Sequence, residues 1–500
     1  MVTLDVIFAL TFPSLRVSAN HIIIFGDIMD TRWHLVIDLV IIVIFFVAMG
    51  QFRTPRGARR GNITAAFALL CAMIVVLSRN TLQGPAIVIL AMATGSVVGW
   101  LVAMRVGMIQ IPAMVAFQHG AGGIAAFLIS YVELTRNQTD LGVVGQISGI
   151  LGIIIGAVTF SGSMVASAKL AGIVRQTPTL LQKHNNILAT LLLSLAAFGF
   201  VASNTTGATL LCASLGLIGL SILLGIIFAM RIGGADMPVL ISFLNATAGI
   251  AASFCGIVIQ NRLLIACGAT VAASGSILTH VMCAAMNRSL FNVLIAADLK
   301  PATAALADTK NIEASLPSFS IEETTESPAQ APLDRAVEAA RNAQKVIMIP
   351  GYGMALAHAQ FEVVEIAILL KKQGKEVQFA IHPIAGRMPG HMHVLLAEAE
   401  ADPDILFDLP EINPQFQETD LVLIVGACDV VNPAAITTEG TPISGMPILA
   451  AHEAKHVLVC NLDARPGYSG VDNPLYLNPK TILMLGDAKT TLNNLLQALG

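Results

Sequence analysis

Charged side chains are scarce in this chain of 500 residues, because Asp, Glu, Lys and Arg together make up only 12% of it. A soluble protein carries about 25%. Aromatic residues are also few, at 5%, whereas hydrophobic residues reach 55% and the mean hydropathy is +0.75. The shortage of charge is confined to residues 34–290, since residues 310–500 have an ordinary charge density. We therefore expect two domains with different solvent preferences.

Three further absences exclude classes of function. The chain has no block of basic residues and a net charge of −4, which argues against nucleic acid as a partner. Its seven cysteines include no pair at the spacing of metal ligands, so no metal site is predicted and the thiols are interpreted as small buried side chains. Residues 1–28 lack the basic start and the cleavage site of a signal peptide. They belong to a predicted N-terminal extension, residues 1–33, and translation from Met29 is a hypothesis that the intact mass of the native protein would test.

Long apolar runs within residues 34–290 predict a polytopic α-helical membrane domain with about nine transmembrane helices, because a bilayer core about 30 Å thick needs roughly 20 apolar residues per helix. Small residues such as GAGGIAA and GIIIGA are interpreted as sites of close helix packing. The candidate spans are 34–51, 62–79, 84–104, 113–132, 143–166, 186–203, 207–230, 237–259 and 262–286.

The basic residues select the orientation of these spans. The loops that share a side with the C-terminal region hold Arg53, Arg56, Arg59, Arg60, Arg105, Lys169, Arg175, Lys183 and Arg231. The opposite side holds fewer, namely Arg32, Arg79, Arg136 and Arg262. Positive charge concentrates in cytoplasmic loops, so we expect a multi-pass protein of the cell inner (cytoplasmic) membrane with its C-terminal domain in the cytoplasm.

Polar residues inside the predicted spans are rare, and three of them are candidates for a proton path. His119 lies in the middle of MVAFQHGAGG, Asn245 lies in ISFLNATAG, and Asp236 lies at a span entrance in IGGADMP. An ionisable group in a bilayer is costly and tends to mark a proton or ion path. The alternatives are a neighbour that satisfies His119 and a role for Asn245 in hydrogen bonding between helices. Asp38, close to the end of the first span, is expected to extend toward water.

The C-terminal region, residues 333–500, follows a predicted flexible linker, residues 291–332, that is rich in Ala, Ser, Thr, Glu and Pro. Short apolar strands alternate with helices there, which predicts an α/β doubly wound, Rossmann-like domain with a parallel sheet. The expected strands are 345–349, 376–381, 420–427, 456–462 and 481–486. The expected helices are 333–343, 356–373, 392–401 and 487–499.

A Gly-x-Gly turn follows the first of these strands, in MIPGYGMALAHAQ. Gly351 and Gly353 allow a tight turn and close approach of the backbone to a ligand, and the N-terminus of the next helix attracts a pyrophosphate. The third glycine of the usual fingerprint is missing, because Leu356 and Ala357 stand in its place. The position of the turn between a strand and a helix still predicts a dinucleotide pocket.

The second predicted strand lacks the acidic residue that holds the adenosine ribose in ordinary NAD-binding folds. It ends in Ile381, His382 and Pro383, with no carboxylate. Either the cofactor is not plain NAD, or it lies in a different orientation.

Other predicted strand ends carry loops suited to a ligand, since doubly wound sheets bind ligands at the carboxyl ends of their strands. Arg387, in GRMPGHM, is a candidate for binding a phosphate, and Tyr468, in RPGYSG, for a lid over a bound ring. Asp429 and Asn432, in GACDVVNPAA, follow another strand, and for Asp429 a turn-forming role and a site role both remain open. Asp487, in LGDAK, is expected to cap the final helix.

These motifs together resemble those of the proton-translocating NAD(P) transhydrogenases. PGYGMALAHAQ, IHPIAGRMPGHM, GACDVVNPAA, GYSGVDNPLY and LGDAK resemble the NADP(H)-binding domain of that family, and IGGADMP, LNATAG and MCAAMNRS resemble its membrane domain. The chain looks like the beta subunit of the split, bacterial type, from about residue 30 to the C-terminus. A single fingerprint fits this resemblance, because hydride exchange between two dinucleotides needs a second site on a partner.

The resemblance implies an activity and an assembly. A partner alpha subunit would bind NAD(H) and deliver hydride to NADP⁺ on this chain, and proton passage through the membrane domain would drive the transfer. NADP(H) would lie reversed relative to ordinary Rossmann binding, which would account for the missing acid near His382. The assembly would contain two alpha and two beta subunits in membrane lipid, with the beta subunits paired through their membrane domains.

The resemblance also implies roles for individual residues. His119 and Asn245 match a membrane histidine and a membrane asparagine that are tied to proton conduction, and Asp236 joins them as a proton-pathway candidate by its position. Asp429 matches an aspartate beside the cofactor that takes part in coupling. The predicted cofactor-binding positions are Gly351, Tyr352, Gly353, Met354, Ala355, Arg387, Met388, Pro389, Gly426, Ala427, Asp429, Asn432, Asp463, Arg465, Gly467, Tyr468, Gly486 and Asp487.

One motif departs from the family pattern. The Lys-Arg-Ser run that grips the 2′-phosphate of NADP is replaced by Asn461, Leu462 and Asp463, with Arg465 two positions later. Either Arg465 takes over the phosphate, or Asp463 favours a 2′-hydroxyl. NADP(H) remains the predicted cofactor of this chain.

Two other functions compete with this interpretation. The first is an ion or solute transporter whose cytoplasmic dinucleotide domain senses redox state, and no potassium-filter motif such as TVGYG is present. The second is a membrane scaffold, which leaves the five nucleotide-loop motifs without explanation.

Overall fold

The computed structural model describes residues 19–51, 55–79, 85–136, 141–175, 179, 183–233, 236–287, 289–290, 293, 332–388, 390–439, 441 and 443–500. The chain forms two units, Met1–Ala91 and Met92–Gly500. Residues 1–18 and 294–331, which contain most of the predicted extension and linker, lie outside the described residues. The domain boundaries given above therefore stay predictions.

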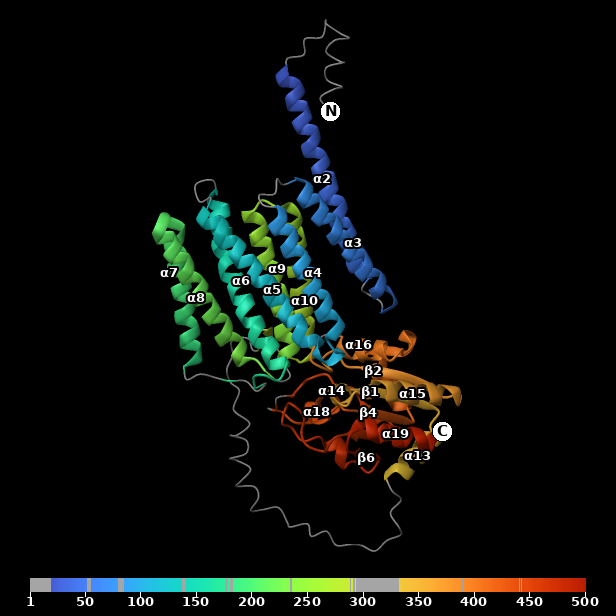
Figure 1. Cartoon of the computed structure of the whole chain (residues 1–500). Helices are drawn as coiled ribbons and strands as arrows, with labels where there is room; N and C mark the ends of the chain where they lie inside the picture. Colours follow the sequence, from blue (N-terminus) through green and yellow to red (C-terminus); the bar gives the residue numbers. More distant parts are fainter. Residues whose placement is uncertain are drawn as a thin grey trace, which may run out of the picture. The chain divides into compact units, whose positions relative to one another are not determined.

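In the described part of the chain, nine helices are long and apolar enough to cross a membrane (Figure 1). They are α2 (Ala19–Gln51), α3 (Pro55–Arg79), α4 (Pro85–Arg105), α5 (Ile111–Arg136), α6 (Val143–Leu170), α7 (His184–Asn204), α8 (Gly207–Arg231), α9 (Met237–Val258) and α10 (Arg262–Ala285), and the short η1 (Met108–Gln110) precedes α5. Every predicted span falls on one of these helices, with ends that differ by a few residues. The prediction of a polytopic helical domain is confirmed.

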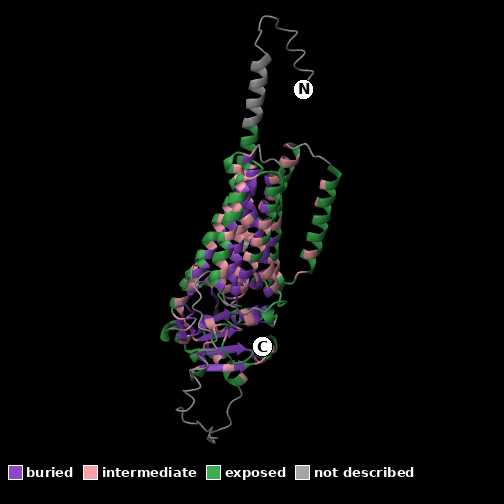
Figure 2. Ribbon diagram, turned by 90° about the vertical axis from the view of Figure 1, so that its left-hand side faces the viewer, coloured by how far each residue is buried: buried purple, intermediate pink, exposed green. Residues whose placement is uncertain are grey.

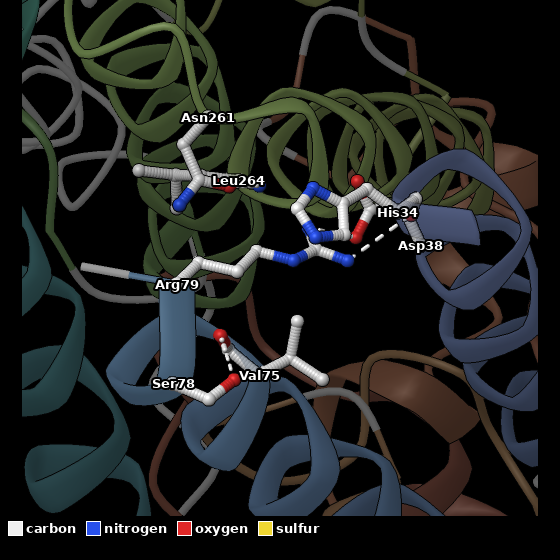
Figure 3. Close-up of polar contacts among 7 residues, drawn as sticks. All are labelled: His34, Asp38, Val75, Ser78, Arg79, Asn261 and Leu264. Atoms are coloured by element: carbon white, nitrogen blue, oxygen red, sulfur yellow. Dashed lines mark hydrogen bonds and ion pairs between the residues drawn. The ribbon is translucent and has the colours of Figure 1, made fainter. Parts of the chain in front are cut away.

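An ion pair joins α2 to α3. The Arg79 guanidinium lies 2.7 Å from the Asp38 carboxylate and also donates to the backbone carbonyl of His34 at 3.1 Å (Figure 3). Asp38 is buried, so the expectation that it extends toward water was wrong. The physical reason is that an arginine on the neighbouring helix supplies the counter-charge that a buried carboxylate needs.

Glycines bring the membrane helices of the second unit into backbone contact. A Cβ added to Gly123 of α5 would lie 2.7 Å from the carbonyl oxygen of Gly156 in α6. Gly249 of α9 and Gly268 of α10 form a matching pair, each with 2.7 Å to the carbonyl oxygen of the other. Such distances exclude any side chain, so close packing explains these small residues. Buried residues accordingly run along the inside of the bundle (Figure 2).

A parallel sheet of six strands forms the C-terminal domain, in the order β3-β2-β1-β4-β5-β6. The strands are β1 (Lys345–Pro350), β2 (Glu376–Ile381), β3 (Leu406–Asp408), β4 (Leu421–Val425), β5 (His456–Asn461) and β6 (Thr481–Leu485). The strand order reverses between β1 and β4, which pair in register from Val346 opposite Leu421 to Pro350 opposite Val425. This doubly wound order confirms the predicted Rossmann-like class and places a switch point between β1 and β4.

Successive residues of β1 point to opposite faces of the sheet. Val346 and Met348 pack on one side with α13, α15, α16 and α19, whereas Ile347 and Ile349 pack on the other with shorter segments. The α-helices are α13 (Pro332–Asn342), α14 (Tyr352–Leu356), α15 (Gln360–Lys372), α16 (His391–Glu398), α17 (Leu409–Ile412), α18 (Ala434–Thr437) and α19 (Ala488–Leu499). The 3-10 helices are η3 (Pro403–Ile405), η4 (Asn413–Glu418), η5 (Asp429–Val431), η6 (Ala451–Glu453) and η7 (Pro474–Leu477).

The structure differs from the prediction in two places. The helix expected over 356–373 begins at Gln360, as α15, and the short α14 precedes it, because His358 between them adopts a left-handed backbone conformation with φ 52°. Strand β3 was not predicted, since a strand of three residues is too short to show an alternating pattern.

Candidate functional site

The turn after β1 and the loop after β4 interlock. The Gly351 N–H donates to the carbonyl of Val425 and the Gly353 N–H to the carbonyl of Gly426, both at 2.8 Å. A Cβ on Gly351 would overlap the Gly426 carbonyl, and Gly426 itself has φ 67°. This loop contact requires all three glycines without any ligand. The N–H groups of Gly351 and Gly353 therefore hold the two loops together, and binding of a pyrophosphate at the N-terminus of α14 stays a prediction.

Aromatic rings surround a cation beside this turn. The Arg387 guanidinium lies 4.3 Å from the ring centre of Tyr352 and donates to the Tyr468 hydroxyl at 3.0 Å. The rings of Tyr352 and Tyr468 lie 6.3 Å apart. A longer bond of 3.5 Å joins the same guanidinium to the carbonyl of Leu170. No carboxylate among the described residues forms an ion pair with Arg387, so its charge suits a phosphate. Burial raises the pKa of Tyr352 above its usual range, with Arg387 acting in the opposite direction.

His391, at the start of α16, supports the loop that carries Arg387. Its Nδ1 accepts a hydrogen bond from the Arg387 N–H at 3.1 Å, and Nε2 is buried without a partner among the described residues. Burial, followed by the nearby Arg387, lowers the pKa of His391 to about 4. The ring is therefore neutral at pH 7, with its hydrogen on Nε2.

Asp429 ties the β4 loop to the segment that holds Tyr468. Its carboxylate accepts a hydrogen bond from the Ser469 hydroxyl at 2.6 Å and another from the Ser469 N–H at 3.0 Å. Burial raises the pKa of Asp429, and the bonds from Ser469 partly offset that rise. A Cβ on Gly467 would lie 2.8 Å from the carboxylate oxygens. The carboxylate is thus placed to respond to movement of residues 467–469.

Asn432 holds the segment after Ser469 by hydrogen bonds. It is fully buried, and its amide nitrogen donates to the carbonyls of Val471 at 3.3 Å and Asp472 at 3.2 Å. Its oxygen accepts from the Ala434 N–H at 3.0 Å. These bonds account for the asparagine as a support of the loop.

The end of β5 holds the residues that replace the Lys-Arg-Ser run. Asn461 turns inward and donates to the Ala427 carbonyl at 3.0 Å and to the Tyr476 hydroxyl at 2.8 Å. Asp463 accepts a hydrogen bond from the Arg465 N–H at 3.0 Å, and its second oxygen lies 3.8 Å from Arg465 Nε. Arg465 is exposed, which leaves its guanidinium open to a ligand in solution.

The end of β2 is closed by the chain itself. His382 Nε2 donates to the Pro447 carbonyl at 2.8 Å, while Nδ1 accepts from the Ile384 N–H at 3.3 Å. Burial lowers the pKa of His382 to about 4, so the ring is neutral. Met446 and Ile448 are buried in a cluster against Ile384. This contact lies at the end of β2, the strand end at which an ordinary fold carries the acid that holds the adenosine ribose.

The remaining predicted cofactor residues have mixed positions. Asp487 caps α19, because its side chain accepts from the Thr490 N–H at 2.9 Å, as predicted, and the Thr490 hydrogen bonds lower its pKa. Gly486 has φ 139°, a conformation that requires glycine. Buried residues are Met354, Ala355 and Ala427, Met388 is half-buried, and Pro389 lies outside the described residues.

The membrane candidates lie on two helices. His119 is on α5, and its buried Nδ1 has no partner among the described residues. Asn245 lies in the middle of α9, and Asp236 immediately precedes the first residue of that helix. No hydrogen bond between described residues joins His119 to Asn245. A hydrogen bond of 3.0 Å from Thr159 of α6 to Thr247, two residues after Asn245, was not anticipated from the sequence.

The cysteines and acidic residues offer no metal site in the described part of the chain. Cys255, Cys283 and Cys460 are buried, as the sequence suggested, whereas Cys212 is exposed on the apolar helix α8. All seven are free thiols.

Comparison with known proteins identifies the family. The sequence model of the family described as NAD(P) transhydrogenase beta subunit matches residues 34–498. The chain is 39% identical over 464 residues to the NAD(P) transhydrogenase subunit beta of Rhodospirillum rubrum, which covers 91% of this chain and 97% of that protein. A second sequence from a named strain of the same organism gives the same figures. The chain belongs to the NAD(P) transhydrogenase beta-subunit family.

Membership of the transhydrogenase family confirms the resemblance on which the predictions rest. Proteins of the beta-subunit family are parts of an enzyme that acts with nicotinamide dinucleotides, and the term beta subunit implies an alpha partner. Together with the nine apolar helices, the family indicates a membrane protein.

Proposed function

We propose that this transhydrogenase subunit binds NADP(H) at the carboxyl edge of its sheet and couples hydride transfer to proton translocation. NAD(H) on a partner alpha subunit gives a hydride to NADP⁺, which yields NAD⁺ and NADPH. The observation that carries the proposal is the cluster of Arg387, Tyr352 and Tyr468 beside Asp429 and Ser469. It combines a phosphate-binding cation, flat rings and a responsive carboxylate at the switch point.

The closed end of β2 supports a reversed orientation of the cofactor. His382 bonds to Pro447 at the strand end where an ordinary fold holds the ribose, and in our proposal the adenosine half therefore lies toward β5 and β6. There Arg465 is the cation for a 2′-phosphate, held by Asp463 until the cofactor arrives. The Gly351 turn contributes shape more than hydrogen bonds, because its N–H groups bond to the β4 loop.

The hydride step itself needs no side-chain acid or base, since the nicotinamide rings supply the chemistry when bound. This chain positions one ring and excludes water from it. Asp429, whose pKa is raised by burial, changes its charge or its bond to Ser469 as the segment around Tyr468 moves. It thereby reports the state of the cofactor to the rest of the chain.

Proton passage involves His119, Asn245 and Asp236 in our proposal. The buried Nδ1 of His119 has no partner among the described residues, which supports this role, because such a ring nitrogen is available to a water or a proton. We place the C-terminal domain in the cytoplasm of a cell whose inner membrane holds the helices, on the strength of the basic loops. Paired beta subunits and two alpha subunits complete the assembly.

The test uses the full chain with its alpha partner in sealed vesicles. We expect NADPH to reduce an NAD analogue at a rate that responds to an imposed pH gradient, and His119→Ala to abolish proton movement together with that response. A rate that ignores the gradient would refute the coupling. Binding of NADPH without turnover would favour a transporter with a redox-sensing domain, and equal affinity for NADH and NADPH would refute the choice of cofactor.

A further inference from the structure

A buried lysine closes the end of a membrane helix. Lys169, the penultimate residue of α6, has no solvent exposure. Its Nζ donates to the carbonyls of Ala229 at 3.0 Å, Met230 at 2.7 Å and Ile232 at 2.7 Å. These carbonyls belong to the last turn of α8 and the residue after it, where a helix has no partners of its own. All three ammonium hydrogens are used, and no carboxylate among the described residues pairs with the charge.

The charge at this position is expensive unless the carbonyls stay in place. A cation at a helix C-terminus is stabilised by the helix dipole, but a buried ammonium that loses its partners is costly. The lysine and the end of α8 therefore hold each other in a fixed geometry. Removing the ammonium would take the donor away from the buried carbonyls of Ala229 and Ile232, whereas the Met230 carbonyl would keep the Thr179 N–H at 3.1 Å. The chain at Ile232 would then be released.

The residues around this contact lead to the predicted proton path. Ala116 of α5, one turn before His119, packs in one buried cluster with Ile232. The same cluster contains Leu244, the neighbour of Asn245. Ile232 also lies four positions before Asp236 in the chain. By holding Ile232, Lys169 thus fixes a position against which α5 and α9, the two helices that carry the proton-path candidates, are packed.

We infer that Lys169 is a positioning residue for proton translocation, a role that rests on the membrane part of the proposed function. Its ammonium fixes the end of α8 and thereby the connection that leads into α9 at Asp236. Without it, the chain still binds NADP(H), because the nucleotide site lies in the C-terminal domain. The bond from Arg387 of that site to α6, at 3.5 Å, goes to the backbone carbonyl of Leu170, which a substitution of Lys169 keeps. The helix ends no longer keep the alignment on which a proton transfer depends.

The C-terminal domain supplies a matched control. Lys375 donates to the carbonyls of Ala340 at 2.8 Å, Arg341 at 2.7 Å and Ala343 at 2.6 Å, at the end of α13. It is also buried. The two lysines therefore make the same kind of contact, one in the membrane bundle and one beside the sheet. A purely structural role predicts that their substitutions behave alike.

The experiment compares Lys169→Met, Lys169→Gln, Lys169→Arg and Lys375→Met in the full enzyme in sealed vesicles. Measured are the thermal midpoint, NADPH affinity, and the acceleration of hydride transfer by an imposed pH gradient. We expect Lys169→Met to reduce that acceleration about tenfold or more at unchanged NADPH affinity. Lys169→Arg, which keeps the charge and the donors, restores most of it, and Lys169→Gln lies between. Lys375→Met lowers the thermal midpoint and leaves the acceleration intact.

Several outcomes overturn the inference. They are an unchanged acceleration in Lys169→Met, a loss in both lysine variants in proportion to their thermal midpoints, and an Arg variant no better than Met. If Lys169→Met does not insert, the Gln and Arg variants decide by the same criteria. A wild-type enzyme that ignores the gradient refutes the proposed function and this role with it, whereas a responsive wild type beside a responsive Lys169→Met refutes this role alone.

Discussion

The two sides of the sheet's carboxyl edge end in opposite ways. After β2, the chain covers its own strand end, because His382 bonds to Pro447 and both ring nitrogens are used. After β5, Asn461 turns inward, whereas Asp463 and Arg465 are exposed and pair with each other, with no other side-chain partner among the described residues. Polar groups are satisfied internally on the first side and left available on the second. The comparison teaches that a familiar sheet order does not fix which half of the edge receives a ligand.

The largest effect on cofactor binding is expected for Arg387, which follows β2 in the chain and bonds to Tyr468 in the segment after β5. Arg387→Ala should weaken NADPH binding between about tenfold and a hundredfold, because a hydrogen bond to a charged group contributes about 1.5–3 kcal/mol. Arg387→Lys should recover part of the loss, since a lysine keeps the charge but lacks the planar fork. NADPH fluorescence titration measures both. Arg341→Ala, which removes only a bond to the Ala498 carbonyl, is the control, and an equal effect of both alanines would contradict the prediction.

The closed side is tested through acid stability. The folded-state pKa of His382 is about 4, below its ordinary 6.5, so the unfolded chain binds more protons in that interval. The neutral His382 ring therefore contributes to the free energy of unfolding above pH 6.5. About 3 kcal/mol of that contribution is lost as the pH falls toward 4. His382→Gln keeps a donor for Pro447 but cannot titrate, so it should lose less stability over this range.

Scanning calorimetry of the full chain in detergent from pH 7 to pH 4 measures this difference. The exposed His456, replaced by Gln, is the control. Equal acid sensitivity in wild type and His382→Gln would show that the ring is not the group that opens the β2 side.

The open side is tested through cofactor choice. Asp463→Ser removes the carboxylate that holds Arg465 and repels a phosphate, so the ratio of NADPH to NADH affinity should rise about fivefold to tenfold, a modest effect because the pair is solvated. Arg465→Ala should move the ratio in the opposite direction. Competition titrations with both nucleotides give the ratio. If the ratio is unchanged in both variants, the end of β5 is not part of the proposed pocket.

The smallest effect concerns Asp429. The hydrogen bonds from Ser469 lower its pKa against the effect of burial, so Ser469→Ala should raise that pKa further. The carboxyl then takes up its proton at a higher pH, and the pH profile of hydride transfer should move in the same direction by a fraction of a pH unit, as expected for one lost hydrogen bond. Thr437→Ala, at an exposed position, is the control for the profile. A profile that moves to lower pH would contradict the assignment.

Local pattern was enough to predict most of the fold. The apolar runs gave the membrane spans, the strand expected over 376–381 matches β2, and Asp487 caps the last helix as its sequence context suggested. These features depend on residues that are near neighbours in the chain. The left-handed His358 divides a continuous helical pattern and could not be seen in it.

The contacts that the sequence missed join distant residues. Asp38 pairs with Arg79 of the next helix, and His382 bonds to Pro447, which lies beyond β3 and β4 in the chain. From the sequence, Asn461 is one of the residues that replace the cations of the family motif. In the structure, its side chain donates a buried hydrogen bond to the Tyr476 hydroxyl. Residue type alone indicates that an acid is missing near His382, and the folded chain adds that this histidine bonds to the Pro447 carbonyl.

The three glycines at the switch point have a consequence for how such proteins are recognised. Gly351, Gly353 and Gly426 exclude side chains because two loops touch, whether or not a nucleotide is present. Selection for that contact alone would preserve the fingerprint. A relative that no longer binds a dinucleotide could therefore keep every glycine of the motif. Loss of Arg387 or Asp429 would indicate the change of ligand earlier than loss of a glycine.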